Sequence, residues 1–255
     1  MPVQRGRAGV ETGASLRMLS TSAPSASSIA MASRTIAARL SGLVGLAPAA
    51  GPGRMSEASG TLIAMTDDLI GTQRPVRRVT EPEEATAALE RAVPELVEHR
   101  RPVPAVLDWA LLEDGLGTAL PADYKYLAEW YATFALGDFL LVGLPEPGEE
   151  RSWLRGVRGD LEGVIQDWWD AGMSIGLRPH PAPGGLLPWA ESNEGDKFLW
   201  SATGDDPQGW LVTIASRNGG WWHYEGGAVQ FLAEYCDGTL EPWALPPVGP
   251  DVTRC

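Results

Sequence analysis

The chain has 255 residues, of which 44% are hydrophobic and 21% are charged, and its formal net charge at pH 7 is −13. This composition is typical of a globular protein, and the length allows one large domain or two small ones. Because phosphate backbones and anionic membranes repel negative charge, direct binding to nucleic acid or to a membrane is disfavoured. No stretch approaches the roughly 18 consecutive apolar residues that a membrane-spanning helix needs.

Charge is distributed unevenly along the chain. Residues 1–54 contain six arginines and one acidic residue, whereas residues 55–255 contain 14 basic and 32 acidic residues, a net charge of −18. The first segment is rich in Ala, Gly, Ser, Pro and Thr, and no aromatic residue precedes Trp109. Such a segment cannot bury enough apolar surface to offset an ordering entropy of about 1–2 kcal/mol per residue. We therefore expect residues 1–64 to be a disordered, low-complexity head, or to lie before a true start at Met55 or Met65.

Two targeting alternatives apply to the same head. Acid-poor segments rich in Arg and Ser are typical of organelle transit peptides. Residues 40–50, behind Arg34 and Arg39, resemble a short secretory apolar region, but they begin late and contain Gly and Pro. Disorder or an incorrect start fits the composition better than either alternative.

The two cysteines, Cys236 and Cys255, do not make a disulfide framework, so the sequence predicts a reducing, cytoplasmic compartment.

A globular domain is expected over residues 80–245, with residues 246–255 as a tail. Acidic residues around Pro82 begin a helical pattern of apolar residues that runs to Leu96, and Pro94 is expected to kink or split this helix. The first half of the domain is therefore mainly helical. Further helices are predicted over 105–113, 121–131 and 159–173, with a short strand over 137–143 and an acidic loop over 145–150.

The second half of the domain is predicted to consist of strands followed by one helix. A final helical pattern begins at Ala228 and ends at Gly238, a residue type that is favoured just after a helix C-terminus. Helices, then a meander of strands, then a helix indicate an α+β fold with a mostly antiparallel sheet. The predicted strands, rich in aromatic and β-branched residues and separated by turn clusters, cover residues 186–190, 197–202, 210–215 and 220–225.

Several segments occur in the order and spacing of a known family. After Trp109 and Glu113 come LGTALPADYKYLAEWY (116–131), FLLV (139–142), GLLPWAESNEGDKFLW (185–200), DPQGWLVTIA (206–215), GWW (220–222) and VQFLAEYCDGTL (229–240). On these segments the chain resembles the SUKH superfamily, in its Smi/Knr branch of cell-wall assembly regulators and bacterial immunity proteins. The resemblance covers about residues 105–240, and Gly195 and Asp196 followed by Trp200 are its most specific piece. One departure is Gly226 and Gly227, where such proteins often carry a Ser, Thr or Asp that caps the last helix.

The resemblance implies a single α+β domain, in which helices pack around a bent, mostly antiparallel sheet. It also implies that the protein is not an enzyme and has no universal catalytic residues. Many bacterial members of the family neutralise a partner toxin, often a nuclease or deaminase, by binding it. Others act as protein-interaction hubs.

The residues themselves contain no catalytic or metal-binding motif. The three histidines, His99, His180 and His223, lack the spacing of metal-ligand pairs, and no HExxH, CxxC, nucleophile elbow or phosphate-binding loop occurs. We expect His99 on the surface, His180 in a loop between two prolines, and His223 on the surface or on a face of the sheet. The sequence thus predicts no cofactor, no metal and no catalytic residue.

Two groups of residues are candidates for contact with a partner. Five carboxylates in two loops that flank one strand are expected at the same end of the sheet, as a docking surface for a basic protein. Solvated turns, or a calcium site without the regular EF-hand spacing, are alternatives for the same residues. Four tryptophans near loop ends are of the type enriched in binding hot spots, while the others, including Trp109, Trp168 and Trp200, are expected in the core. The candidates are Trp189, Glu191, Glu194, Asp196, Asp205, Asp206, Trp210, Trp221 and Trp222.

The resulting hypothesis is a non-catalytic, immunity-type protein that binds and occludes a basic toxin partner. The negative charge of residues 55–255 favours it, because that charge attracts and steers a basic protein such as a nuclease. A regulatory or scaffold protein with several partners is the first alternative. A metal-dependent enzyme that uses the carboxylates of residues 191–206 is the second.

Overall fold

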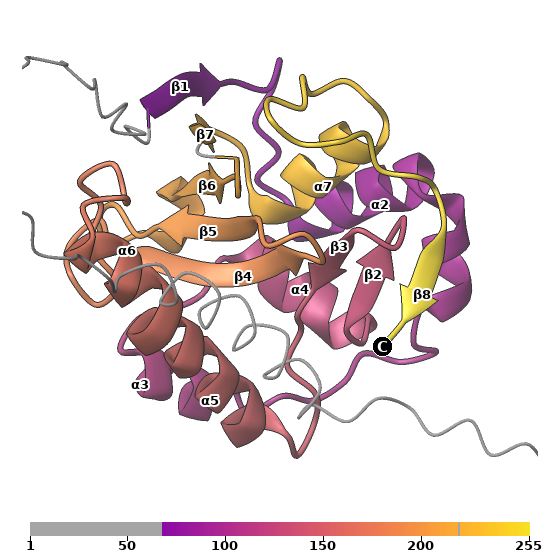
Figure 1. Ribbon diagram of the computed structural model, residues 1–255. Coiled ribbons are helices and arrows are strands. Elements are labelled where there is room, and N and C mark those ends of the chain that lie inside the picture. Colours follow the sequence, from indigo (N-terminus) through magenta and orange to yellow (C-terminus); the bar gives the residue numbers. More distant parts are fainter. Residues whose placement is uncertain (1–67, 219) are drawn as a thin grey trace, which may run out of the picture.

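The computed structural model describes residues 68–218 and 220–255 of the chain. The expected disorder of residues 1–64 lies outside these residues. The predicted α+β class is confirmed, because helices surround one mostly antiparallel sheet (Figure 1). Its strands are β1 (Asp68–Gln73), β2 (Phe134–Leu136), β3 (Leu140–Val142), β4 (Leu186–Ser192), β5 (Lys197–Ser201), β6 (Leu211–Ala215), β7 (Gly220–Tyr224) and β8 (Val252–Arg254).

The strands follow the order β1-β7-β6-β5-β4-β3-β2-β8 across the sheet. Only β1 and β7 pair in parallel among the strands of the described residues, and all other neighbours are antiparallel. The four predicted β-rich runs correspond to β4, β5, β6 and β7, which confirms the predicted meander. Pro188 lies inside β4, a central strand, and the pairing of β4 with β5 shifts register next to it, as expected for a residue that cannot donate a hydrogen bond.

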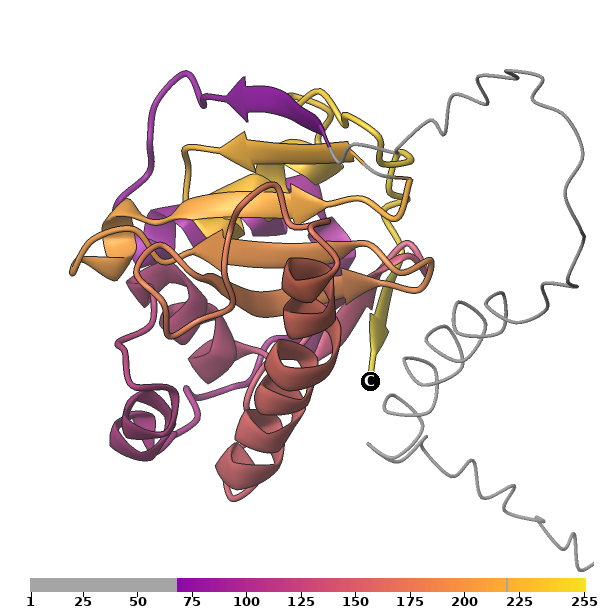
Figure 2. The same cartoon turned by 60° about the vertical axis from the view of Figure 1, so that its left-hand side comes forward.

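The helices are α2 (Pro82–Ala92), α3 (Trp109–Leu116), α4 (Ala122–Trp130), α5 (Glu150–Asp160), α6 (Gln166–Asp170) and α7 (Ala228–Cys236). A π-helical turn, Leu161–Ile165, joins α5 to α6 into one long helix, visible beside the strands in Figure 2. Pro94 ends the first helix as predicted, and a 3-10 helix, Pro94–His99, follows it. Gly238 has the left-handed backbone conformation, with a φ of 77°, that the sequence predicts after α7.

The long helix begins earlier than the predicted residue 159. It starts at Glu150, directly after Glu149, because carboxylates are favoured at the positive N-terminal end of a helix. The two residues therefore form a helix start rather than part of an acidic loop. Gly156 and Gly159 interrupt the apolar pattern in between and conceal the helix in the sequence.

The sheet extends beyond the predicted domain limits of 80–245. β1 precedes them, and its Asp68 lies opposite Gly220 of β7. β8 lies inside the predicted tail, 246–255, and pairs with β2. Both are edge strands, which are less buried than central ones and therefore carry little apolar pattern. The folded unit thus includes residues at both ends of the described chain.

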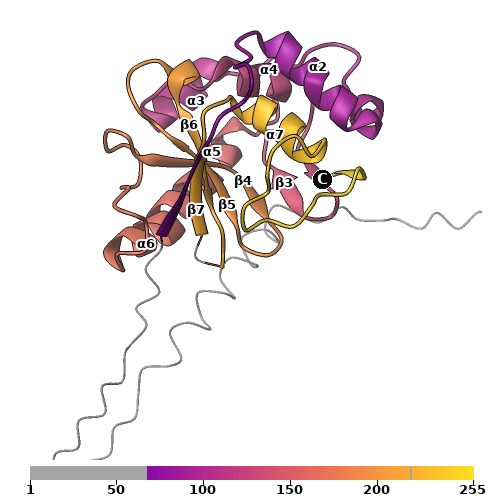
Figure 3. The same cartoon turned by 90° about the horizontal axis from the view of Figure 1, so that it is seen from above.

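Helices cover both faces of the sheet. Figure 3 shows α2, α4 and α7 on one side of the strands and α6 on the other. The larger core contains Phe198, Trp200 and Trp222 with the apolar faces of α2, α4 and α7. The smaller core, on the opposite face, joins Ile165 to Leu199, Trp221 and neighbouring strand residues. Alternate residues of one strand thus enter different cores, so neither face of the central strands is left to solvent.

Candidate partner-binding surface

The five predicted carboxylates do not form one surface. Glu191, Glu194 and Asp196 belong to the hairpin that joins β4 to β5, whereas Asp205 and Asp206 belong to the loop that joins β5 to β6. Loops that precede and follow one strand leave it at opposite ends, and β5 is roughly 16 Å long. The prediction that these carboxylates share one end of the sheet is therefore wrong.

Two carboxylates of the first hairpin, those of Glu191 and Asp196, make contacts inside the fold. Nζ of Lys197 lies 2.5 Å from Oε2 of Glu191 and 3.0 Å from Oδ2 of Asp160, and the lysine side chain is buried. Asp196 is also buried. Its carboxylate accepts hydrogen bonds from Oγ of Ser192 (2.5 Å) and from the backbone N–H of Arg217 (2.9 Å). The carboxylates of Glu191 and Asp196 therefore find their ion-pair and hydrogen-bond partners within the protein.

The other three carboxylates reach solvent. Glu194 is half-exposed and lies 3.8 Å from Nε of Arg217, a long and solvated ion pair. Asp206 caps the short 3-10 helix Pro207–Gly209 by accepting a hydrogen bond from the backbone N–H of Gln208 (3.0 Å), and Asp205 is exposed beside it. These residues fit the alternative of solvated turns better than a joint docking surface.

The four candidate tryptophans are buried. Trp189, Trp210 and Trp221 each expose 3% of their surface and Trp222 exposes none. Trp221 packs edge-on against Trp168 of α6, with ring centroids 5.6 Å apart, and the other three belong to the larger core. The structure thus contradicts the expected accessibility of these four rings near loop ends, because helices cover both faces of the sheet beside them.

Partly exposed aromatic rings lie instead on α3 and α4. Trp109, Tyr126 and Trp130 are partly exposed, and Trp109 and Trp130 also pack against the larger core. The expectation that Trp109 is a core residue is therefore only partly met. Nε1 of Trp109 donates a hydrogen bond to Glu129 (3.0 Å), and the Tyr126 and Trp130 rings lie 6.1 Å apart. The sequence contained a signal for this surface, because residues 126 and 130 lie off the apolar stripe of α4 that faces the core.

Two exposed valines continue the aromatic surface. Val103 and Val106, in the connector before α3, expose 68% and 90% of their surface. The connector is held along the C-terminal end of α4, since the N–H of Ala105 donates to the carbonyl of Glu129 (2.7 Å) and that of Arg101 to Trp130 (2.9 Å). We define the α3–α4 surface as Val103, Val106, Trp109, Tyr126 and Trp130.

Charged side chains frame the α3–α4 surface. The guanidinium of Arg100 stacks 4.2 Å from the Trp130 ring, and Nζ of Lys125 lies 5.5 Å from the Trp109 ring. Both cations are already paired, Arg100 with Glu90 and Lys125 with Glu113. The rings therefore have the geometry for cation–π contact, while the local positive charge is neutralised.

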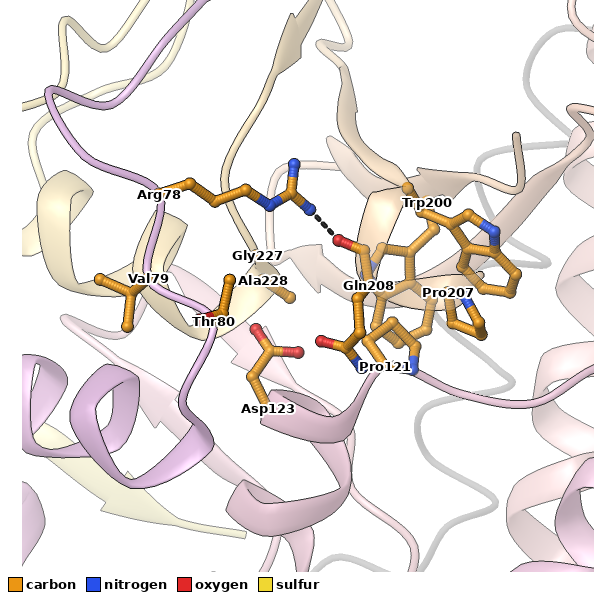
Figure 4. Close-up of a pocket in the computed structure, with 11 residues that line it drawn as sticks. Arg78, Val79, Thr80, Pro121, Asp123, Trp200, Pro207, Gln208, Gly227 and Ala228 are labelled. Atoms are coloured by element: carbon orange, nitrogen blue, oxygen red, sulfur yellow. Dashed lines mark hydrogen bonds between the residues drawn. The ribbon is translucent and has the colours of Figure 1, made fainter. Parts of the chain in front are cut away.

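A small cavity beside α7 contains the buried carboxylate of Asp123 (Figure 4). Its volume is about 20 Å³. That is room for about one water molecule, whereas small-molecule sites usually span roughly 300–1,000 Å³. Arg78 closes one side by donating hydrogen bonds to the carbonyls of Gln208 and Glu225. The cavity is therefore a structural feature and not a ligand site.

Asp123 supplies the helix cap that the sequence lacks at Gly226 and Gly227. Its Oδ2 accepts a hydrogen bond from the backbone N–H of Val229 (3.0 Å), in the first turn of α7, and its Oδ1 accepts from Tyr124 (2.8 Å). Burial raises the pKa of the Asp123 carboxyl, and the two backbone donors and the nearby Arg78 only partly oppose this. The cap thus comes from α4 and not from the residue before the helix.

The remaining chemistry-bearing groups of the described residues do not converge. No cluster of three or more His, Cys, Asp or Glu residues suited to a metal ion occurs in residues 68–218 and 220–255. His180 contacts the carbonyl of Leu116 (2.8 Å), and Nδ1 of His223 contacts Oγ1 of Thr213 (2.9 Å). Burial lowers the pKa of His223.

Among the helices of residues 68–218 and 220–255, none is long and apolar enough to span a membrane.

The fold and the surface define an α+β protein with a covered sheet and partly exposed aromatic rings on α3 and α4. Comparison with protein-family models, with curated proteins and with solved structures gives no match for the chain. The resemblance to the SUKH superfamily therefore stays a prediction from the sequence segments.

Proposed function

We propose that this chain is a non-catalytic, SUKH-type protein-binding module that occludes a basic protein partner, such as a toxin nuclease, through its α3–α4 surface. The observation that carries the proposal is the partial exposure of three aromatic rings beside two exposed valines. Large side chains of this kind form the centres of protein interfaces, where Trp, Tyr and Arg contribute most of the binding energy.

Charge favours a basic partner. Residues 68–255 carry 30 acidic and 14 basic side chains, and salt bridges within the described residues use seven of the basic ones. Carboxylates therefore dominate the outer surface and would raise the association rate of a cationic protein. Around the α3–α4 surface, the carboxylates of α3, α4 and the α3 cap that are not buried are Asp108, Glu113, Asp114 and Glu129. The two cations beside the rings, Arg100 and Lys125, are each paired with a carboxylate.

The rings themselves supply apolar contact area. Arg100 and Lys125 already lie over the Trp130 and Trp109 rings and are paired with Glu90 and Glu113, so attraction of a basic partner comes from the surrounding carboxylates. The proposal includes a cytoplasmic location, with which two free cysteines, Cys236 and Cys255, agree. The carboxylates of residues 191–206 do not converge, so they lend no support to the metal-dependent alternative.

A matched pair of valine variants tests the proposal. Val106→Arg places a positive charge on the α3–α4 surface, and Val76→Arg places the same charge on a fully exposed valine outside it. We expect Val106→Arg to weaken binding about tenfold or more, because it repels a basic partner and blocks apolar contact, and Val76→Arg to change it less than about twofold. Both variants should keep their stability within about 0.5 kcal/mol, since neither side chain is buried.

The measurement starts from affinity capture with the full-length chain at low and high salt, followed by titration of the captured protein against each variant. A single basic partner, released by salt and sensitive to Val106→Arg, would support occlusion of a toxin. Several moderate partners with the same sensitivity would instead support a regulatory scaffold. Equal effects of the two valine variants would contradict a role for the α3–α4 surface.

A further inference from the structure

A groove between α3 and α5 gathers positive charge on this otherwise acidic protein. Its volume is about 590 Å³, and Leu111 and Leu154 contribute apolar side chains to it. Gly115 allows α3 and α5 to approach closely, because a Cβ at this position would lie 2.6 Å from Cδ1 of Leu154. The groove therefore follows from the packing of the two helices, and it is large enough to hold part of a peptide.

Three arginines of α5 line the groove. Arg151, Arg155 and Arg158 lie at positions i, i+4 and i+7, so they share one side of the helix over roughly 10 Å. Arg158 donates a hydrogen bond to the carbonyl of Gly115 (2.6 Å) at the end of α3. Arg151 and Arg155 are exposed and form no salt bridge with any described residue, whereas seven other basic side chains of residues 68–255 do.

We propose that this groove binds an acidic, amphipathic helical segment of a protein. Guanidinium groups recognise carboxylates with paired hydrogen bonds, and arginines one helical turn apart match carboxylates one turn apart on the bound helix. The leucines of the groove accept the apolar side of the same segment. The net negative charge of the protein does not prevent this, because charges farther than about 8 Å are largely screened at physiological ionic strength.

The groove adds a second binding surface of opposite charge to the proposed one. The α3–α4 surface is framed by carboxylates and suits a basic partner, whereas the groove suits an acidic segment. The ligand of one surface would be repelled by the other. A negative result for one surface therefore does not contradict the proposal for the other. Variants of the α5 arginines test the groove, and Val106→Arg tests the α3–α4 surface.

The test uses the full-length chain and a fluorescent synthetic helical peptide of about four turns, with Leu on one face and Glu on the other. Fluorescence anisotropy should show saturable binding, and Arg151→Glu with Arg155→Glu should weaken it about tenfold, since two attractive pairs become repulsive. Arg91→Glu, at an exposed arginine of α2, should change it less than about twofold, because α2 lies away from α3 and α5 (Figure 1).

Two further measurements keep the result specific. Glu162 lines the groove near the arginines, so Glu162→Gln should tighten binding of the acidic peptide about twofold. A peptide with Gln in place of Glu should bind about tenfold more weakly. No saturable binding, equal loss with Arg91→Glu, or equal binding of single-stranded DNA with the same charge would overturn the proposal.

Discussion

Replacing Lys197 with Met is expected to lower the free energy of unfolding by about 3 kcal/mol. The lysine is only 5% exposed, and its Nζ pairs with both Glu191 and Asp160. Methionine fills the same space, but it leaves the two carboxylates facing each other without a cation. Both carboxylates keep some contact with water, which is why the expected loss lies at the lower end of the range for a broken buried ion pair.

Lys125→Met is the matched control, because Lys125 pairs with Glu113 at 2.9 Å but is partly exposed. Its expected cost is less than about 1 kcal/mol. Neutralising all three groups, with Lys197→Met, Asp160→Asn and Glu191→Gln together, should restore most of the loss. Urea unfolding of the four proteins provides the comparison, and equal losses in the two single variants would mean that burial of Lys197 has no energetic consequence.

The same lysine gives the fold a dependence on high pH. Burial alone would lower the pKa of Lys197, but the charges of Asp160 and Glu191 outweigh it and raise the pKa. A pKa that is higher in the folded state than in the unfolded chain stabilises the fold at any pH below the unfolded-state pKa, about 10.4 for lysine. This contribution is lost as the pH rises through the folded-state pKa. The advantage of the wild type over Lys197→Met should therefore shrink above about pH 10.4, which urea unfolding of both proteins measures.

Gly227→Ala is expected to lower the free energy of unfolding by about 2 kcal/mol. A Cβ at this position would lie 2.4 Å from Oδ2 of Asp123, the atom that caps α7. The backbone of Gly227, with a φ of −76° and a ψ of 167°, is one that alanine also adopts, so the cost comes from the contact and not from conformational strain.

A double-mutant cycle isolates this contact. Asp123→Ala should cost about 2–3 kcal/mol, because it leaves the backbone N–H groups of Val229 and Tyr124 without their acceptor. In that background Gly227→Ala no longer meets a carboxylate, so the double variant should lose at least about 1 kcal/mol less than the two single losses added. Additive losses in the free energy of unfolding would show that Gly227→Ala destabilises the protein through contacts other than the one with Asp123.

Gly156→Ala serves as the control of opposite sign. Gly156 is exposed in α5, and a Cβ there would meet no atom within 4 Å. The change should stabilise the protein by about 0.5–1 kcal/mol, because glycine is a poor helix former. Thermal or urea unfolding of the glycine variants side by side separates the effect of the Asp123 contact from the general effect of adding a methyl group.

The sequence predicted those elements whose signals are local. The strands β4 to β7 are bounded by turn clusters, and Pro94 and Gly238 end helices through their own backbone chemistry. The edge strands escaped prediction because their pairing depends on distant segments: β1 pairs with β7, about 150 residues away in the chain. The start of the long helix escaped because Gly156 and Gly159 break its apolar pattern.

The candidate site was harder to predict, because exposure depends on which faces of the sheet are covered. Trp221 is buried by α6, an element on the face that a two-layer fold would leave to solvent. Asp196 looks like a surface turn residue, but Ser192 and the Arg217 backbone enclose it. By contrast, Tyr126 and Trp130 could have been identified from the helical pattern of residues 121–131, because they lie off its apolar stripe.

The pairing of β8 with β2 bears on how the protein should be produced. Residues 252–254 occupy the hydrogen-bonding edge of β2, and the N–H of Cys255 extends this pairing to the carbonyl of Thr133 (3.1 Å). A recombinant chain shortened to residue 245, the domain limit that the sequence pattern suggests, would leave the β2 edge open. An open edge is a template for aggregation and for strand exchange between copies. In the intact chain β8 forms the edge instead, and a short strand with exposed Thr253 and Arg254 is a poorer template for such pairing, so β8 is best kept.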